Sequence, residues 1–500
     1  MIDKSNLNQE HRYPDRYATF YRVVDEVMTD LESYVPSGET KPKRKVSGSQ
    51  RDKLRLSIAR LISDSVAIIW QRKRVEAASI DRNRNVYGMG NAYPDLGYTL
   101  HVERAFNGMV GLGLLKVTAL GYYMRTPSAG SPRGKNTRYV ATDQLLDMFT
   151  DEEQLVLPAI IPPHYPHPLI RVRIKEPDGT RGRAMAAEET DQSISMGSRV
   201  AYINSVLEQH WIDVGLPDEV IVEILKHHPG DEGDERQLNL NNRLLYRVFN
   251  SHDLSTGGRF YGPFWHNMPK ALRPYLLIDG IPTVEVDYSN QHPTILYAME
   301  REKPPLDAYD GVISHLGIEG HKAKNARGMI KKSFNAMLNA LKPMKNSPDG
   351  VKPKDFGLKW REISDAIMAY HQPIAHHFYT GVGRRLQQMD SSIAERVLIQ
   401  FARYGIPVLP VHDSFVVQED YELVLRVVMN DEFIVVVERS PDLKLSKQQG
   451  SYLANSTELD LDAFDRLMKH KVPEHTSDDD VGHERRLRAF QQQTAFVVKN

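Results

Sequence analysis

The chain has 500 residues, of which 41% are hydrophobic and 26% are charged, and it contains no cysteine. This length exceeds what one hydrophobic core supports, so roughly two to four domains are expected. The absence of cysteine excludes disulfides, thiolate zinc sites and cysteine nucleophiles. No apolar run reaches the length of about 18 residues that a membrane span needs, so membrane insertion is not expected.

Positive charge is concentrated in one segment of an otherwise balanced chain. Residues 41–140 contain 19 Lys and Arg against 6 Asp and Glu, a net +13, and the remainder carries −14. Such a basic module fits either a solvated surface or nucleic-acid binding. The first 16 residues are polar and lack the apolar core of a secretory signal, so we expect a cytoplasmic protein.

Residues 1–50 are predicted to form an N-terminal helix and a basic linker, and residues 51–150 a winged-helix-like domain. Two segments with helical spacing precede two strand-like runs, which flank the basic loop RTPSAGSPRGKN. Helices followed by a basic hairpin resemble a winged helix, whose wing contacts phosphates. The alternative is a small structural α/β domain, and winged helices also dock proteins. The nucleic-acid-binding candidates are Arg125, Arg133, Lys135 and Arg138.

Residues 151–250 combine Pro-rich connections, one polar helix and an acidic loop, which predicts a connecting or thumb-like region. Residues 476–500 open with an acidic run and end in a basic, Gln-rich segment, so we predict a C-terminal tail or a peripheral helix. Neither region has a pattern that indicates chemistry. The informative motifs lie between them, in residues 251–475.

The first motif is TVEVDYSNQHPTILYAM, which joins a strand pattern to a helix pattern. A run rich in β-branched residues carries Asp287 to a strand end, and helical spacing begins at Pro293. A carboxylate at this position is well placed to bind a metal ion.

The second motif, KNARGMIKKSFNAMLNA, is predicted to be a helix with two neighbouring stripes. Arg327, Lys331 and Asn335 recur at every fourth residue and present polar groups. The adjoining apolar stripe, which would pack against the protein, contains Ile330, Phe334, Met337 and Leu338. Basic residues four apart are commonly just a solvated helix face.

The third motif, GIPVLPVHDSFVV, is almost continuously apolar, as expected for a strand buried on both faces. His412 and Asp413 interrupt it. An unpaired buried carboxylate costs about several kcal/mol, so Asp413 would need a cation or a proton. The alternative is a hairpin turn at these residues, because the sequence HDS is compatible with a turn. We favour the strand, since the apolar run resumes directly afterwards.

Two strand-borne aspartates with a cationic helix between them are the parts that phosphoryl transfer needs. Carboxylate oxygens suit Mg²⁺, and two ions about 4 Å apart would activate a 3′ hydroxyl and stabilise the leaving pyrophosphate. Lys331 and Arg327 would neutralise the triphosphate. The expected cofactor is therefore a pair of Mg²⁺ ions, with Mn²⁺ as a substitute.

At these residues the sequence resembles the palm and fingers of family A DNA polymerases and of the related single-subunit RNA polymerases of bacteriophages and mitochondria. DYSNQHPTIL is similar to the first palm motif, usually DYSQIELR in the DNA enzymes, and ARGMIKKS to the fingers helix. VHDSF resembles the last palm motif, which is HDE in the DNA enzymes and HDSF in the phage RNA enzymes. The match covers about a third of the chain.

The resemblance implies an α+β fold: a right-hand polymerase with an antiparallel palm sheet, helical fingers and a thumb, behind the winged-helix-like domain. Palm and fingers would occupy residues 251–475. Asp287 and Asp413 would be the metal ligands, Arg327 and Lys331 would contact the triphosphate, and His412 would lie near the primer terminus. The catalytic candidates are thus Asp287, Asp413, Lys331 and His412.

The segment before the first motif, STGGRFYGPFWHNMPKALR, is similar to its counterpart in the family, which implies that Arg259 and Arg273 meet template or primer.

Asn339 departs from the family, because a Tyr normally stands there and checks the base pair and sugar. His292, five residues after Asp287, stands where the DNA enzymes select the sugar. Its imidazole could block a 2′ hydroxyl, favouring deoxynucleotides, or hydrogen-bond to it, favouring ribonucleotides. The nucleotide-binding candidates are Arg327, Lys331, His292, Asn335 and Asn339.

The resemblance predicts a nucleotidyltransferase, and we favour a DNA-directed DNA polymerase acting in DNA replication. Its partners would be DNA template and primer, nucleoside triphosphates and accessory replication proteins. An RNA polymerase or primase with the same site is the first alternative, and Asn339 leaves template-independent tailing open. A third is a catalytically silent DNA-binding initiator or regulator, against which the intact charged residues argue.

Overall fold

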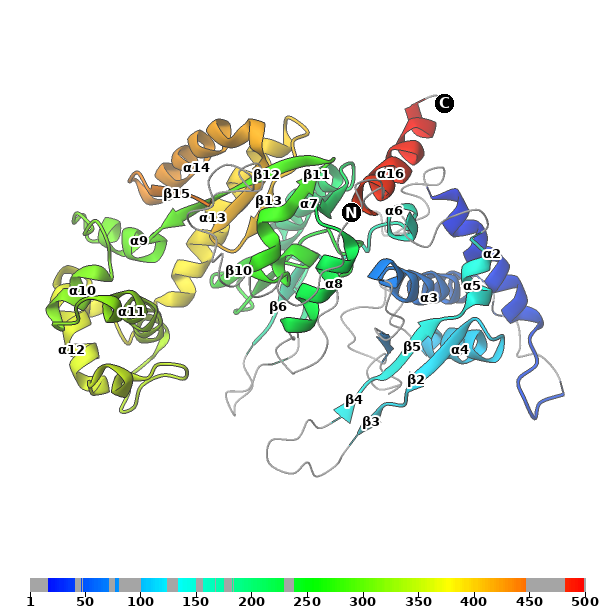
Figure 1. Ribbon diagram of the computed structural model, residues 1–500, viewed down its shortest axis with the longest axis horizontal. Helices are drawn as coiled ribbons and strands as arrows, with labels where there is room; N and C mark the ends of the chain where they lie inside the picture. The colour runs from blue at the N-terminus through cyan, green and yellow to red at the C-terminus, as the bar shows by residue number, and fades with distance from the viewer. Residues whose placement is uncertain are drawn as a thin grey trace.

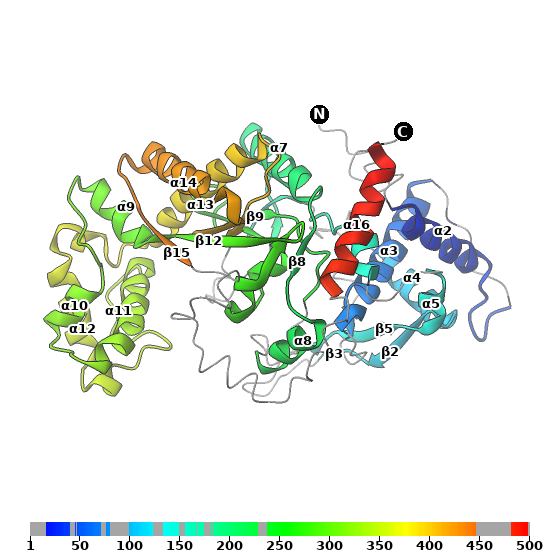
Figure 2. The ribbon, with the colours of Figure 1, turned by 45° about the horizontal axis from the view of Figure 1, so that its top comes forward.

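The computed structural model arranges the chain in three parts, which Figures 1 and 2 show from two directions. An N-terminal unit lies on one side of a central unit, and a lateral helical unit lies on the other side. None of the helices among the described residues has the length and apolar character needed to cross a bilayer. The described residues are 17–40, 46, 48–71, 77–80, 100–123, 134–149, 156–166, 168–174, 182, 184–228, 238–446 and 482–498.

The N-terminal unit packs helices against a three-stranded antiparallel sheet of order β1-β5-β2. Its helices are α2 (Ala18–Ser33), α3 (Ser49–Val66), α4 (Leu100–Gly111) and α5 (Asp143–Asp147). Its strands are β1 (Ala78–Ile80), β2 (Leu115–Ala119), β5 (Thr137–Ala141) and the short hairpin pair β3 (Tyr122–Tyr123) and β4 (Gly134–Lys135). The two helices and the later strands predicted within residues 51–150 are present, but β1, which the sequence did not predict, lies between the helices and pairs with β5.

Helix α2 belongs to the same core as α3, although residues 1–50 were expected to form a separate helix and linker. Phe20, Val24 and Val27 of α2 are at most 1% exposed and lie in one apolar cluster with Ile62 and Phe106. The basic spacer between α2 and α3 hid this packing in the sequence. Helix α6 (Leu157–Ile160) extends the same cluster toward the central unit.

The central unit begins within residues 151–250, the region predicted to be a connection. A four-stranded sheet of order β10-β9-β6-β7 forms there, with β6 and β9 parallel and the other pairs antiparallel. Asn204 ties α7 to β9 through its amide, which bonds both the carbonyl and the N–H of Leu245. The elements are β6 (Ile170–Val172), β7 (Met185–Ala186), α7 (Asp191–Leu207), α8 (Asp218–His227), β9 (Tyr246–Phe249) and β10 (Gly257–Tyr261).

A larger antiparallel sheet of order β13-β14-β12-β11-β8 forms the middle of the central unit, and β15 also pairs with β12. Its strands are β8 (Ile212–Val214), β11 (Leu276–Ile278), β12 (Ile281–Ser289), β13 (Leu409–Val411), β14 (Ser414–Gln418) and β15 (Asp442–Ser446). Helices α13 (Gly383–Ala402) and α14 (Glu422–Val437) pack on each other and on strands of the two sheets. Helices combined with mainly antiparallel sheets confirm the predicted α+β class.

The lateral unit is helical. It consists of α9 (Gln291–Met299), α10 (Asp310–His315), α11 (His321–Asn339), α12 (Trp360–Tyr370) and the 3-10 helices η8 (Pro353–Phe356) and η9 (Gln372–His377). Helix α11 contains the helix predicted at the second motif, and Ile330, Phe334, Met337 and Leu338 of its predicted apolar stripe are all fully buried. Helix α9 begins two residues before the predicted start at Pro293.

Helix α16 (Gly482–Val498) lies between the central and N-terminal units in both views (Figures 1 and 2). Of the two predictions for residues 476–500, a tail or a peripheral helix, the described residues form the helix, although one of its side chains reaches the core. Arg486 is fully buried, and its guanidinium bonds Asp213 at 2.7 Å and Asp218 at 3.2 Å. A basic, Gln-rich sequence suggested a solvated segment, but the cationic residue neutralises two acids of the central core.

Replacing Arg486 with Ala is expected to destabilise the central unit strongly. The change leaves Asp213 and Asp218 buried without their cation, which costs about 3–5 kcal/mol. Chemical denaturation followed by circular dichroism measures the effect. Gln492→Ala on the exposed side of the same helix is the control, with an expected change of at most about 0.5 kcal/mol. Equal midpoints for the two variants would contradict this role for Arg486.

Candidate active site

The site is built on β12, whose side chains alternate between two environments. Val286 and Tyr288 are buried, and Glu285 and Asp287 lie on the opposite face with partial exposure. A strand places every second side chain on the same face, so the two carboxylates share one surface of the sheet. The hydroxyl of Tyr288 donates to the carbonyl of Met429 in α14 at 2.7 Å, which fixes the buried face.

Strands β13 and β14 bring Asp413 beside Asp287. Asp287 pairs with Ser414 in the β12–β14 register, and the N–H of Tyr288 donates to the carbonyl oxygen of Asp413 at 3.4 Å. His412 and Asp413 form the two-residue turn between the strands, since Val411 pairs with Ser414. The prediction of one continuous buried strand is therefore wrong, and the hairpin alternative is right. The apolar residues on each side belong to two short paired strands, and Asp413 is only partly buried.

The carboxyl group of Asp287 is only partly compensated by the described protein. Burial, followed by the negative charges of Asp413 and Glu285, raises the pKa of Asp287 to about 7. Its Oδ1 atom is buried and has no hydrogen-bond partner among the described residues. A buried carboxylate oxygen without a donor, beside a second carboxylate, is the environment that a hard divalent cation stabilises.

Two lysines oppose this accumulation of negative charge. Lys331 of α11 and Lys444 of β15 both lower the pKa of Asp287, although by less than burial and the acids raise it. Lys444 pairs directly with Asp287 in the β12–β15 register. Lys331, predicted as a catalytic cation, is exposed on the lateral unit, so the structure brings it near the carboxylates from a different part of the fold.

Glu285 is held on the carboxylate face by two donors. Arg273 donates to its Oε1 at 2.9 Å, and the hydroxyl of Ser414 donates to the same oxygen at 2.5 Å. Arg273, predicted to contact template or primer, therefore forms an ion pair with a site carboxylate in this structure. Ser414 links Glu285 directly to the strand that follows Asp413.

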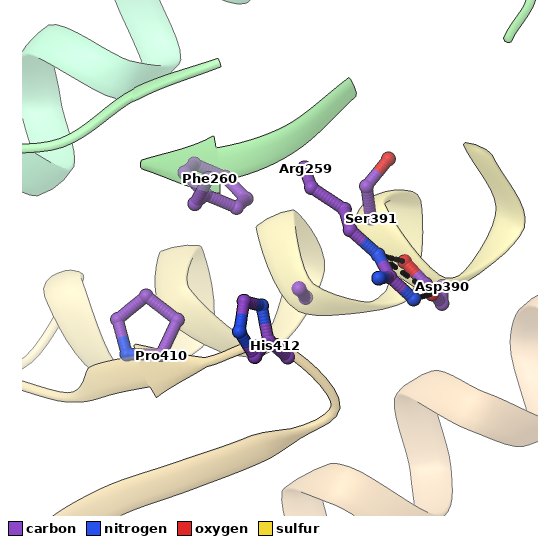
Figure 3. A pocket seen from close by; sticks show the side chains of 7 residues that line it. Arg259, Phe260, Asp390, Ser391, Pro410 and His412 are labelled. Atoms are coloured by element: carbon purple, nitrogen blue, oxygen red, sulfur yellow. Dashed lines mark hydrogen bonds and ion pairs between the residues drawn. The ribbon is translucent and has the colours of Figure 1, made fainter. Parts of the chain in front are cut away.

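A second charged group lines a small pocket between β10, α13 and the β13–β14 turn (Figure 3). Arg259 forms an ion pair with Asp390 of α13 at 2.6 Å. Nε2 of His292, the predicted sugar-selecting residue, lies 3.3 Å from the same carboxylate. Asp390 is only 3% exposed, so its two partners compensate a buried charge. His412 closes the pocket on the side of the turn.

The predicted triphosphate ligand Arg327 is engaged elsewhere in this structure. Its guanidinium forms ion pairs with Asp307 and Asp310 and lies over the ring of Tyr309, 5.1 Å from the ring centre. The two backbone N–H groups of Tyr309 and Asp310 also bond to Asp307. The side chain of Arg327 is 42% exposed, so it remains accessible from solvent.

Asn335 and Asn339 lie on successive turns of α11. The side-chain amide of Asn339 donates to the carbonyl of Asn335 at 2.8 Å. A Cβ atom at Gly383, the first residue of α13, would approach Oδ1 of Asn339 to 2.5 Å. Asn339 therefore lies against the backbone at the start of α13, where the larger Tyr of the resembled families would require this contact to change.

His412 adopts a positive φ of 59° at the tip of the β13–β14 turn. Its ring stacks on that of His266 at a centroid distance of 6.1 Å. His266 donates to the carbonyl of Pro410 at 2.6 Å, and burial lowers the pKa of His266 to about 4. Loss of solvent and then the positive charge of Arg259 lower the pKa of His412. The neutral ring of His266 therefore packs against the side chain of His412, whose backbone is strained.

The basic candidates of the N-terminal unit are placed only in part. Arg125 and Arg133 lie outside the described residues. The backbone of Lys135 is in β4, opposite Tyr122, and Arg138 is in β5, opposite Ser79. Arg138 is partly buried in the middle strand of the sheet.

Several residues of the site were missed from the sequence. Glu285 was detectable, because it lies two positions before Asp287 in a run with strand character. Asp390 and Lys444 gave no local signal, since only long-range pairing brings them to the site. Asp307 lies in an irregular segment whose bonds to Arg327 depend on the fold of the lateral unit.

No protein-family profile matches this chain, and no curated protein matches it. Among solved structures, the chain is similar to the POL domain of Pol1 from M. smegmatis, which was solved in complex with a DNA primer-template and dNTP. The two share 11% sequence identity and a TM-score of 0.30, and the alignment covers 51% of each chain. The chain thus spans about half the length of this neighbour, with too little common backbone to transfer a role from one to the other.

The stability contributed by Asp287 in metal-free protein is expected to depend on pH. The pKa of its carboxyl rises from about 4 in the unfolded chain to about 7 in the folded one, so the folded state binds more protons between these values. Stability is then lost as the pH rises through this window. In EDTA, Asp287→Asn should raise the thermal unfolding midpoint more at about pH 8 than at about pH 5. Exposed Asp420→Asn is the control, and a pH-independent gain would disprove the shift.

The positive φ of His412 gives a second prediction, on the backbone alone. A non-glycine residue in this region costs about 1 kcal/mol, which glycine avoids. His412→Gly and His412→Ala both remove the ring that stacks on His266, so their difference isolates the backbone. We expect His412→Gly to unfold at a higher denaturant concentration than His412→Ala. Identical midpoints would mean that the turn is not strained.

Proposed function

We propose that this protein is a template-directed nucleotidyltransferase that adds nucleotides to a 3′ hydroxyl, with Asp287 and Asp413 as the metal-binding carboxylates. The observation that carries the proposal is the buried, unpartnered Oδ1 of Asp287 beside Asp413, with a pKa raised to about 7. A carboxylate in this state is costly unless a cation joins it. A free-energy cost of this kind is expected at a site where the bound cation takes part in the reaction.

The donor set supports magnesium. Asp287 and Asp413 offer carboxylate oxygens, and the nearby Glu285 offers a third carboxylate whose Oε1 already accepts from Arg273 and Ser414. Hard oxygen ligands suit Mg²⁺, and Mn²⁺ accepts the same ligands. When bound, two such ions would activate the 3′ hydroxyl and neutralise the departing pyrophosphate.

The chain's own cations would position the triphosphate. Lys331 already interacts electrostatically with Asp287, so it faces the space where a triphosphate next to the carboxylates would lie. Arg327 sits one helical turn away and would exchange Asp307 for a phosphate oxygen. An arginine held by two carboxylates is kept oriented and charged until an anionic substrate competes for it.

The fold supports a hand-like assignment of parts. The sheet around β12, with α13 and α14, would serve as the palm, and α10, α11 and α12 would serve as the fingers. Parts of the region between residues 151 and 250 are integrated into the palm side of the molecule, so a separate thumb is not assigned there. The N-terminal unit, with its order of helices, strands and hairpin, would act as a winged-helix-like module on DNA.

The sugar preference follows from His292. Its imidazole lies 3.3 Å from the buried carboxylate of Asp390, which Arg259 also holds. A ring fixed in this way keeps its bulk beside the sugar position, and its Nε2 is occupied by Asp390 instead of being available to a 2′ hydroxyl. This arrangement supports deoxynucleotides as substrates and a DNA polymerase as the function. Primer extension with ribonucleotides in place of deoxynucleotides would detect an RNA product directly.

Purified protein is expected to extend a primer on a DNA template with Mg²⁺ and deoxynucleotides, and Asp413→Asn should reduce the rate by at least about a hundredfold. Asp420→Asn, an exposed acid just after β14, is the matched control and should leave the rate unchanged. Products are resolved by length on a denaturing gel, with and without primer and template, and with deoxy- or ribonucleotides.

Each outcome of this gel assigns a function. Ribonucleotide products that begin without a primer would replace the DNA polymerase proposal with a primase or transcriptase. Extension without a template would indicate tailing. Absence of product in every arm, while the intact chain still binds DNA, would overturn the catalytic proposal in favour of a DNA-binding protein.

A further inference from the structure

Two segments of the chain connect the lateral unit to the central unit. The chain leaves the central sheet from β12 through α9, and it returns through η9 into α13. Glu300 lies at the end of α9, and His376 and His377 lie at the end of η9. These three side chains meet where α9 packs against η9, and they take no part in the site around Asp287.

The three side chains form a compact donor cluster. Nε2 of His377 lies 2.7 Å from Oε1 of Glu300, and Nε2 of His376 lies 3.2 Å from the same oxygen. Within the described portion of the chain, they form the one group of three or more histidines and acids whose ligand atoms all lie within 4.8 Å of one another. Two imidazole nitrogens and one carboxylate oxygen make up a known zinc ligand set.

The backbone fixes Glu300 in place at the end of α9. The N–H of Arg301 bonds to the carbonyl of Ala298, and the N–H of Glu302 bonds to the carbonyl of Tyr297. Together with the positive φ of Arg301, these bonds form a Schellman motif. The helix dipole disfavours a carboxylate at this end of a helix, so a cation bound to Glu300 would convert an unfavourable contact into a favourable one.

The second connecting segment, which begins with η9, is held by the buried side chain of His371. His371 accepts a hydrogen bond from the hydroxyl of Tyr297 at 3.1 Å and donates one to the carbonyl of Ala308 at 2.8 Å. Burial lowers the pKa of His371 to about 4, which keeps the ring neutral as this pattern requires. Residues from α9 and from the start of η9 are therefore fixed relative to each other before any ion binds.

We propose that Glu300, His376 and His377 form a binding site for a divalent transition-metal ion of the zinc class. The bound ion would link the end of α9 to the end of η9. Zinc bonds of about 2.0–2.2 Å place neighbouring ligand atoms roughly 3.3 Å apart in a tetrahedron. The 3.2 Å between His376 and Glu300 matches this separation, and the 2.7 Å hydrogen bond of His377 would lengthen by about half an ångström when the ion binds. His376 is 59% exposed, which leaves the fourth position open to water. Imidazole ligands favour zinc over Mg²⁺, so this site is chemically distinct from the carboxylates of Asp287 and Asp413.

The test is zinc binding by the full chain, prepared without a polyhistidine tag and stripped of metal by a chelator. Isothermal titration with Zn²⁺ should give one site whose affinity falls at least about tenfold in His376→Ala and in Glu300→Gln. His376 is the preferred variant because its side chain is more exposed than those of the other two ligands, so its loss is expected to disturb packing least. The control His315→Ala removes another exposed histidine of the lateral unit and should bind as the unmodified chain does.

Three further readouts complete the test. Titration with Co²⁺ should produce the visible absorption of a four-coordinate site in the unmodified chain and lose it in His376→Ala. Zinc should also raise the thermal unfolding midpoint of the unmodified chain more than that of His376→Ala. Asp287→Asn with Asp413→Asn should leave this binding unchanged. Equal zinc affinity in His376→Ala and the unmodified chain, or no binding by either, would reduce the cluster to ordinary hydrogen bonds and overturn the proposal.

Discussion

Antiparallel pairing of β12 with β14 brings Asp287 beside Asp413 from distant parts of the sequence. The side-chain repeat of a strand is two residues, so a slip of one position would turn Asp287 toward the core and expose Val286. Val286 and Tyr288 are buried against α14, which makes such a slip costly. Apolar packing on one face of β12 therefore determines the position of the charges on the other.

Several charged groups near this strand compensate one another in ion pairs, but Asp287 has only partial compensation. Glu285 is matched by Arg273, and Asp390 by Arg259 and His292, whereas the charges of two lysines compensate Asp287 only in part. Backbone strain at the neighbouring His412 lies in the same small region. An incompletely compensated carboxylate and a strained backbone that lie together are the kind of local departure that concentrates at functional sites.

Local patterns in the sequence predicted much of this arrangement. The apolar stripe of α11 and the strand that carries Asp287 were identified because their periodicities are intrinsic to single elements. The turn at His412 was misassigned, because two short strands that pair with each other leave the same apolar run as one long strand. The roles of Asp390 and Lys444 depend on contacts between distant segments, and no spacing rule reports such contacts. Burial of Arg486 was invisible for the same reason.

The position of Arg486 also constrains the order in which the protein can mature during synthesis. Asp213 and Asp218 precede Arg486 by 273 and 268 residues, so β8 and the start of α8 leave the ribosome long before their cation exists. Until then, closing the central core around these acids would bury uncompensated charge. The core can therefore reach its final packing only after Arg486 itself has been translated. The arrival of this one guanidinium completes the compensation of the two buried acids.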